Sequence, residues 1–206
     1  MNEAAEMEMF WREKHEGADR VYLTGNGENT LDKLHVRGLF FTVVALLNIG
    51  VGLGEFERFA RAYVQRLDCA DITRAALTAV TGVADHFYEG VSFVPKNTYD
   101  LVTELLVAQH VSDATLHEHL AYGIAALRED GIFALQVADY LQPPTPDVLA
   151  KNYTTAAMKA GSVKRTETTV RGLIERAGGA VINVIRGQEY PAYESVWVVY
   201  HIKRTT

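Results

Sequence analysis

The sequence predicts an α/β fold in which a mostly parallel sheet is covered by helices on both faces. Short, nearly continuous apolar runs alternate with amphipathic segments over residues 40–137, and such runs are typical of strands buried on both faces of a parallel sheet. Two β-rich runs, 181–185 and 196–202, are separated by a turn-rich stretch, which indicates an antiparallel hairpin. The expected architecture is therefore a series of alternating units that ends in a hairpin at the sheet edge.

The alternating part is expected to begin with a strand at 40–49, followed by a helix with apolar side chains at helical spacing over 56–63. A second strand ends at Asp71, and Thr73 caps a helix that runs to Ala84. The other elements expected here are a strand at 99–107, an amphipathic helix from Asp113 to Asp130-Gly131, and a strand at 132–137.

Length and composition favour one domain over residues 1–206, because a chain of this size with 48% apolar residues can bury one sizeable core. The net charge is −6 and no block of like charge is present, so neither a nucleic acid nor a membrane is an expected partner. The acidic N-terminus does not resemble a secretion signal, and no apolar segment reaches the roughly 20 residues that cross a bilayer. We therefore expect a cytoplasmic protein. Its single cysteine, Cys69, excludes an internal disulfide and a cluster of thiolate metal ligands.

A glycine-rich turn, N-I-G-V-G-L-G at residues 48–54, lies between the first predicted strand and the helix after it. Glycine allows the backbone to approach a ligand closely, and a helix N-terminus offers free N–H groups and the positive end of its dipole. Glu55 occupies the sixth position of the G-x-G-x-x-G pattern, where a nicotinamide-binding turn requires a small residue. The turn therefore predicts a ligand site and disfavours a nicotinamide-dependent reductase.

Asp71 ends the second predicted strand and follows Asn48 by 71 − 48 = 23 residues. Adjacent parallel strands would bring its carboxylate beside the glycine turn, where it can accept hydrogen bonds from both hydroxyls of a ribose. The alternative is that Asp71 only caps its own helix together with Thr73. The spacing from the glycine turn favours the ribose.

Five segments in a characteristic order and spacing carry a family resemblance: L-L-N-I-G-V-G-L-G (46–54), C-A-D-I-T (69–73), Y-D-L-V (99–102), L-V-A-Q-H-V-S-D (106–113) and L-R-E-D-G-I-F (127–133). Over nearly its whole length the chain resembles the class I S-adenosylmethionine-dependent methyltransferases, in particular those of small-molecule and surface-glycan pathways. The resemblance implies a Rossmann-like, seven-stranded sheet and S-adenosylmethionine as cofactor. It also implies methyl transfer to an oxygen or nitrogen atom of a small molecule or sugar.

The resemblance assigns the cofactor site residue by residue. Gly50, Gly52 and Gly54 would pack under the methionine and ribose parts, Asp71 would hold the ribose, and Ile72 would lie against the adenine.

The chain departs from the family pattern in two places. Asn48 stands where the family usually has an acid, and no third strand is evident between Val83 and Tyr99. The second departure leaves Asp85 as the candidate for the adenine amino group.

The N-terminal part at 1–35 is expected to be helical and to cover the site. His15 to Gly25 resembles the corresponding region of such methyltransferases, so Tyr22, Leu23 and Thr24 would close over the cofactor. The alternative is an amphipathic helix that packs Trp11 against the sheet. Residues 139–165 contain three prolines and little periodicity, and a long segment of this kind in a compact domain is usually a lid or disordered. We expect it to be a substrate lid.

Methyl transfer from a sulfonium requires mainly the positioning of an in-line nucleophile. Glu104, Gln109 and His110 follow the fourth expected strand, at the edge where open α/β sheets bind ligands, and we expect Glu104 and Gln109 to contribute to the cofactor site. His110 is the candidate base because imidazole titrates near neutrality; alternatively, it is bonded to its loop or backs the cofactor. Tyr140 and Tyr153 are expected either to line the acceptor pocket or to pack within the lid.

Two functions stay open. One is the methyltransferase, and the other is a catalytically silent cofactor-binding module that regulates or scaffolds a partner, which the amide at Asn48 and the lack of a compelling base favour. A metal site is not expected, because His117 and His119 are two residues apart on a helix and point to different sides.

Overall fold

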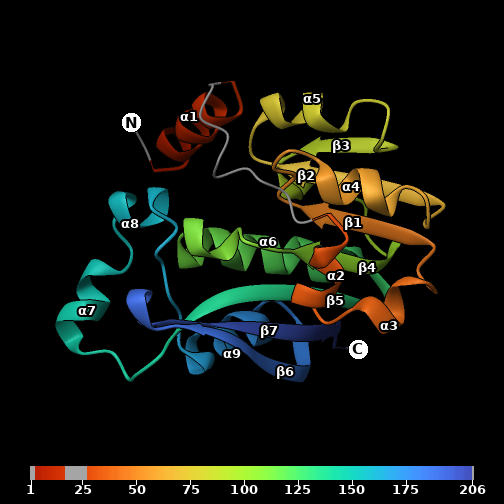
Figure 1. Cartoon of the computed structure of the whole chain (residues 1–206). Coiled ribbons are helices and arrows are strands. Elements are labelled where there is room, and N and C mark those ends of the chain that lie inside the picture. The colour runs from red at the N-terminus through yellow and green to blue at the C-terminus, as the bar shows by residue number, and fades with distance from the viewer. Residues whose placement is uncertain (1–2, 17–26, 206) are drawn as a thin grey trace.

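The computed structural model describes residues 3–16 and 27–205, and within them seven strands form one sheet in the order β3-β2-β1-β4-β5-β7-β6 (Figure 1). The first five strands in the chain pair in parallel, whereas β7 runs antiparallel to both β5 and β6. The mostly parallel sheet with a C-terminal antiparallel hairpin is therefore confirmed. The strands are β1 (Ala45–Ile49), β2 (Arg66–Asp71), β3 (His86–Glu89), β4 (Tyr99–Glu104), β5 (Leu127–Tyr140), β6 (Gly179–Tyr190) and β7 (Ser195–Arg204).

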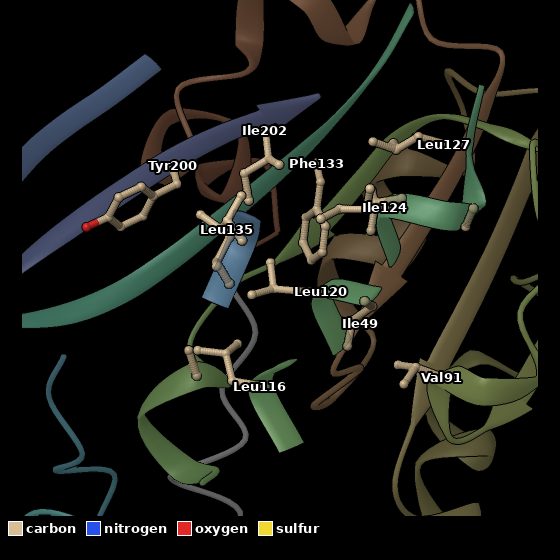
Figure 2. Close-up of a cluster of buried hydrophobic side chains, with 14 of the residues drawn as sticks. Ile49, Val91, Leu116, Leu120, Ile124, Leu127, Phe133, Leu135, Tyr200 and Ile202 are labelled. Atoms are coloured by element: carbon tan, nitrogen blue, oxygen red, sulfur yellow. The ribbon is translucent and has the colours of Figure 1, made fainter. Parts of the chain in front are cut away.

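Helices cover both faces of the sheet (Figure 1), as the burial of every residue of β1 requires. Leu47 and Ile49 face one core together with α6 and α9, part of which Figure 2 shows, while Leu46 faces the core under α2, α3 and α4. The helices are α1 (Glu3–Glu16), α2 (Asn29–Lys33), α3 (Arg37–Phe40), α4 (Glu55–Ala60), α5 (Leu77–Val80), α6 (Asp113–Ala126), α7 (Pro146–Lys151), α8 (Thr155–Lys159) and α9 (Glu167–Arg176).

Several expected boundaries are wrong. Strand β1 begins at Ala45 because residues 37–40 form α3, whose Phe40 is buried among the aromatic rings of α4. The helix after Thr73 ends at Val80. The third strand exists at 86–89, where an edge position leaves half of its side chains exposed and hides the apolar pattern.

The largest boundary error lies at Asp130-Gly131, which belongs to β5 and does not end α6. Helix α6 stops at Ala126, and β5 begins with the next residue and pairs with β4 through a shift of register. Gly131 sits where a Cβ would lie 2.8 Å from the carbonyl oxygen of Tyr99. This glycine therefore allows two strands to approach closely and is not a helix stop signal.

The proline-containing segment at 139–165 is not a single irregular loop, because it contributes the end of β5 and both α7 and α8. Thr145 and Thr154 cap these two helices through their side chains. Its last part is bonded to the loop after β4, since the Val163 amide donates to the Gln109 carbonyl and Arg165 is completely buried there. Residues 158–165 therefore form a fixed wall beside the carboxyl ends of the strands.

Candidate functional site

A cavity of about 300 Å³ lies at the carboxyl ends of the parallel strands, and Met7 and Trp11 of α1 belong to its lining. Helix α1 contacts both α8 and the short turn Arg74–Ala76 that follows β2, so it spans the cavity from one side to the other. None of the described residues that line the cavity is Lys or Arg. The lining residues used below are Met7, Trp11, Asn48, Gly50, Gly52, Asp71, Ile72, Gly90, Val91, Ser92, His110, Glu118, His119 and Met158.

The glycine turn after β1 forms part of the cavity wall. Gly50, Gly52 and Gly54 all have positive φ, at 83°, 56° and 72°, a region that residues with a Cβ avoid. At Gly50 a Cβ would lie only 2.2 Å from Cγ2 of Val107, so glycine also allows close approach of the loop after β4. Gly50 and Gly52 line the cavity, whereas Gly54 lies below it as the N-cap of α4, against the carbonyl of Ala79.

Asp71 links β2 to this turn. Its Oδ2 accepts a hydrogen bond from the Val51 amide at 3.0 Å, and its Oδ1 accepts from the amide and hydroxyl of Thr73 at 2.9 and 3.1 Å. The carboxylate thus caps the chain after β2 and also lies against the glycine turn, as the spacing predicts. Because Asp71 lines the cavity and its Oδ2 accepts only one hydrogen bond, this oxygen has a further lone pair that can accept a hydrogen bond from a ligand.

The region next to Asp71 is lined by residues from two other loops. Ile72 is 40% exposed beside it, and the turn after β3 contributes Gly90, Val91 and Ser92. The sequence analysis missed these three residues because it did not find β3. Their signal was weak: a Gly-Val-Ser run after a half-exposed strand.

Asn48 lines the cavity, but its side chain is already bonded inside the protein. Its Nδ2 donates to Glu57 Oε1 at 2.6 Å and to the Gly50 carbonyl at 3.1 Å, and its Oδ1 accepts from the Thr103 hydroxyl at 2.8 Å. Glu57 on α4 is completely buried. Sequence reasoning missed Glu57, although an acid next to Phe56 on the apolar face of a helix was a signal.

Glu104 lies behind the cavity and not in its lining. Its Oε2 accepts a hydrogen bond from Nδ1 of His119, on α6, at 3.2 Å. Burial acts to lower the pKa of His119, but the charge of Glu104 and this hydrogen bond outweigh it and raise the pKa. His119 and Glu118 line the cavity, whereas His117 does not. The His-Glu-His motif therefore contributes one histidine to the site, and that histidine is paired with Glu104. Among residues 3–16 and 27–205, no three His, Cys, Asp or Glu side chains are arranged to hold a metal ion.

His110 lies at the other end of the cavity, against α1 and α8. Its Nδ1 contacts the Met158 carbonyl at 2.8 Å, and because a carbonyl only accepts, Nδ1 carries the proton and Nε2 of the neutral ring is an acceptor. The Trp11 ring meets the imidazole edge to face, with centroids 4.7 Å apart. Burial lowers the pKa of His110. The ring is therefore held in place, and the lowered pKa favours its neutral form. Trp11 thus packs against this imidazole and not against the sheet.

Besides Gly54 and Glu104, four candidate site residues lie outside the cavity lining. Asp85 precedes β3 and is therefore at the opposite, amino edge of the sheet, where it accepts from Arg61 and the Leu67 amide; its expected contact with adenine is wrong. Gln109 is buried and donates to the carbonyl of Leu106. Tyr140 and Tyr153 do not line this cavity. They pack within the segment at 139–165, where the cations of Lys164 and Arg165 lie over their rings. Tyr22, Leu23 and Thr24 lie outside the described residues.

Comparison with known proteins shows what the chain is similar to. No protein-family model and no curated protein matches the sequence. A Burkholderia thailandensis 1,6-didemethyltoxoflavin-N1-methyltransferase, with bound 1,6-didemethyltoxoflavin and S-adenosylhomocysteine, matches 98% of this chain and 88% of its own at a TM-score of 0.70 and 18% identity. The chain has the methyltransferase fold.

Two further solved structures agree. An S-adenosylmethionine-dependent methyltransferase of Leishmania major matches 98% of this chain and 83% of its own, with a TM-score of 0.69 and 15% identity. The N-methyltransferase NodS of Bradyrhizobium japonicum, in complex with S-adenosylhomocysteine, matches 87% of each chain, with a TM-score of 0.60 and 15% identity. The expected Rossmann-like methyltransferase fold is therefore confirmed. No helix among the described residues has the length and apolar character needed to span a membrane.

Proposed function

We propose that the protein binds S-adenosylmethionine and transfers its methyl group to a nitrogen or oxygen atom of a small molecule. One observation carries this proposal: the Asp71 carboxylate and the positive-φ turn at Gly50 and Gly52 line the same cavity, at the edge of the sheet where open α/β folds bind ligands. A carboxylate suits a ribose diol, and close-packed backbone suits an aminoacyl group. The residues present therefore fit an aminoacyl nucleoside.

The two ends of the cavity suggest a division of labour. Asp71, Ile72 and the turn Gly90–Ser92 would hold the nucleoside, while Trp11 and His110 would face the methyl acceptor. One of the similar structures is a 1,6-didemethyltoxoflavin-N1-methyltransferase, and the edge-to-face contact of Trp11 with His110 suits an aromatic acceptor. The proposed acceptor is therefore a small molecule that offers a nitrogen or oxygen atom for methylation.

When bound, the cofactor supplies an electrophilic methyl group on a sulfonium. The protein then contributes mainly the alignment of the acceptor and the exclusion of water by α1 above the cavity. His110 would accept the acceptor's proton at Nε2, because Nδ1 is held by the Met158 carbonyl and the ring is neutral at pH 7. Asp71 would fix the ribose, and Asn48 would keep the glycine turn in place.

Cofactor binding is tested by titrating the protein with S-adenosylhomocysteine in a calorimeter. Asp71→Ala should weaken binding at least about tenfold, since it removes a charge-assisted acceptor. Asp85→Ala, the matched control at the opposite edge of the sheet, should leave the dissociation constant unchanged. If wild type gives no heat at millimolar ligand, or if both variants bind alike, the proposed site is wrong.

Catalysis is tested with labelled S-adenosylmethionine and a panel of small aromatic amines and phenols. His110→Gln replaces the imidazole with a neutral amide of similar size that cannot act as a base. It should lower kcat about 10²-fold or more and leave the affinity for S-adenosylhomocysteine unchanged. A variant as active as wild type would remove His110 as base. Cofactor binding without transfer to any acceptor would instead support the catalytically silent module.

A further inference from the structure

Glu57 is a buried carboxylate that the proposed reaction does not use. Its Oε1 accepts from Nδ2 of Asn48 at 2.6 Å, and Sγ of Cys69 lies 3.9 Å from the same oxygen. Among the described residues Oε2 has no hydrogen-bond partner, and the side chain is completely inaccessible. An unpaired buried carboxylate is costly to keep, so its presence directly below a ligand cavity calls for a physical explanation.

The charged and titratable groups around Glu57 do not neutralise it. Arg58 is next to it on α4, but its guanidinium donates to the carbonyls of Leu53 and Ala79. From β2, Asp71 adds a like charge and Cys69 a thiol. Burial is the main reason why the pKa of Glu57 is raised to about 7. Within residues 3–16 and 27–205, the Glu57 carboxylate therefore has no cation paired with it.

Asn48 connects this carboxylate to the cavity. Both N–H groups of its amide are used, one toward Glu57 and one toward the Gly50 carbonyl, and its oxygen is held by Thr103. The Asn48 amide is neutral and fixed, so the negative charge behind this end of β1 is that of the Glu57 carboxylate. A positive ligand group above Asn48 and Gly50 would meet the field of Glu57.

We propose that Glu57 is a positioning residue that makes the cavity prefer cationic ligands, by placing a buried negative charge behind Asn48 and the turn at Gly50. This inference rests on the proposed function. S-adenosylmethionine carries a sulfonium charge that S-adenosylhomocysteine lacks, so Glu57 would favour the substrate form of the cofactor over the product form. Binding of the cation would also stabilise ionised Glu57 and release a proton to solvent.

The experiment is calorimetric titration of wild type with S-adenosylmethionine and with S-adenosylhomocysteine from about pH 6 to about pH 8. If the sulfonium lowers the pKa of Glu57 by one unit, linkage predicts that affinity for S-adenosylmethionine rises about fivefold over this range. Affinity for S-adenosylhomocysteine should change by less than about twofold. Repeating the titration at pH 7 in two buffers of different ionisation enthalpy gives the number of protons released on binding. A carboxylate with a merely structural role would release none.

Glu57→Gln keeps a hydrogen-bond acceptor for Asn48 but removes the charge. It should abolish both the rise with pH and the proton release, and should bring the two affinities closer together. Glu55→Gln, at an exposed acid on the same helix, is the matched control and should behave as wild type. Asn48→Asp in the Glu57→Gln background moves a carboxylate one layer up and should restore the preference for S-adenosylmethionine.

The outcomes separate the two proposals. If wild type binds neither compound, both the proposed function and this inference fail. If it binds both, but without proton release and with the same pH dependence in Glu57→Gln, only the inference fails. His119 also lines the cavity and has a raised pKa, so the titration is repeated with His119→Gln. Proton release that persists in this variant assigns the proton to Glu57 even where Glu57→Gln does not fold, and release that disappears in it overturns the inference.

Discussion

Replacing Arg165 with methionine should destabilise the fold by about 3–5 kcal/mol, chiefly because two carbonyl oxygens would lose their buried donor. The guanidinium is completely buried, and it donates to the carbonyls of Ala108 and Val111 at 2.7 and 2.6 Å and to Asp113 at 2.7 Å. Methionine fills much of the same space but cannot donate. Each carbonyl left without a donor costs about 1–3 kcal/mol, which accounts for most of the expected loss.

Urea unfolding followed by circular dichroism measures this loss, provided that the slope of the transition stays the same. Arg171→Met is the matched control: its Nε also bonds a carboxylate at 2.7 Å, that of Glu167, but both side chains are about 40% exposed. Such a pair four residues apart on a helix contributes about 0.5 kcal/mol or less. A loss below about 1 kcal/mol for Arg165→Met would refute the reasoning, since it would mean that desolvation of the guanidinium cancels its hydrogen bonds.

Two further predictions concern the cavity. Gly50→Ala adds a Cβ 2.2 Å from Val107 at a positive φ, whereas the control Gly82→Ala adds one at a positive φ in open space. Thermal unfolding should therefore show a loss of stability about 2 kcal/mol larger for Gly50→Ala. Equal losses would contradict the clash with Val107. The raised pKa of His119 means that folding favours its protonated form, so its contribution is complete below the unfolded value of about 6.5 and lost as the pH rises through the folded value. Wild type should therefore exceed His119→Asn in unfolding free energy by more at about pH 5.5 than at about pH 9, and an equal difference at both would show that Glu104 does not hold the charge.

The order of elements could be predicted from the sequence because it depends on local apolar pattern. Strands β1, β4 and β5 are largely buried and were recognised from their apolar residues. Strand β3 lies at the sheet edge, has exposed residues at both ends, His86 and Glu89, and was missed. That omission also caused the error at Asp85. With β3 beginning at His86, a residue just before it must lie at the amino edge, far from the ends of β1 and β2.

The sequence was sufficient to predict those site residues that lie at or just after the carboxyl end of a strand. Asp71 and Gly50 end or follow adjacent parallel strands, so counting residues along the chain was sufficient. Glu57 with Asn48, and His119 with Glu104, are contacts between a helix and a strand, and they depend on how each helix is rotated over the sheet. A rotation of one residue on α6, about 100°, would turn His119 away from Glu104, and apolar periodicity does not determine rotation to that accuracy.

Charge distinguishes between the ligand classes that a glycine turn can serve. The same backbone geometry suits a pyrophosphate or an aminoacyl nucleoside, but a pyrophosphate carries negative charge and is usually balanced by Lys, Arg or a metal. Here the described cavity lining offers Asp71 and Glu118 and neither Lys nor Arg, with Glu57 and Glu104 buried just behind it. His119 compensates Glu104, but Asp71, Glu118 and Glu57 have no such partner in the lining. Their charge would repel a dinucleotide and attract a sulfonium, so the electrostatics of this cavity favour the cationic cofactor.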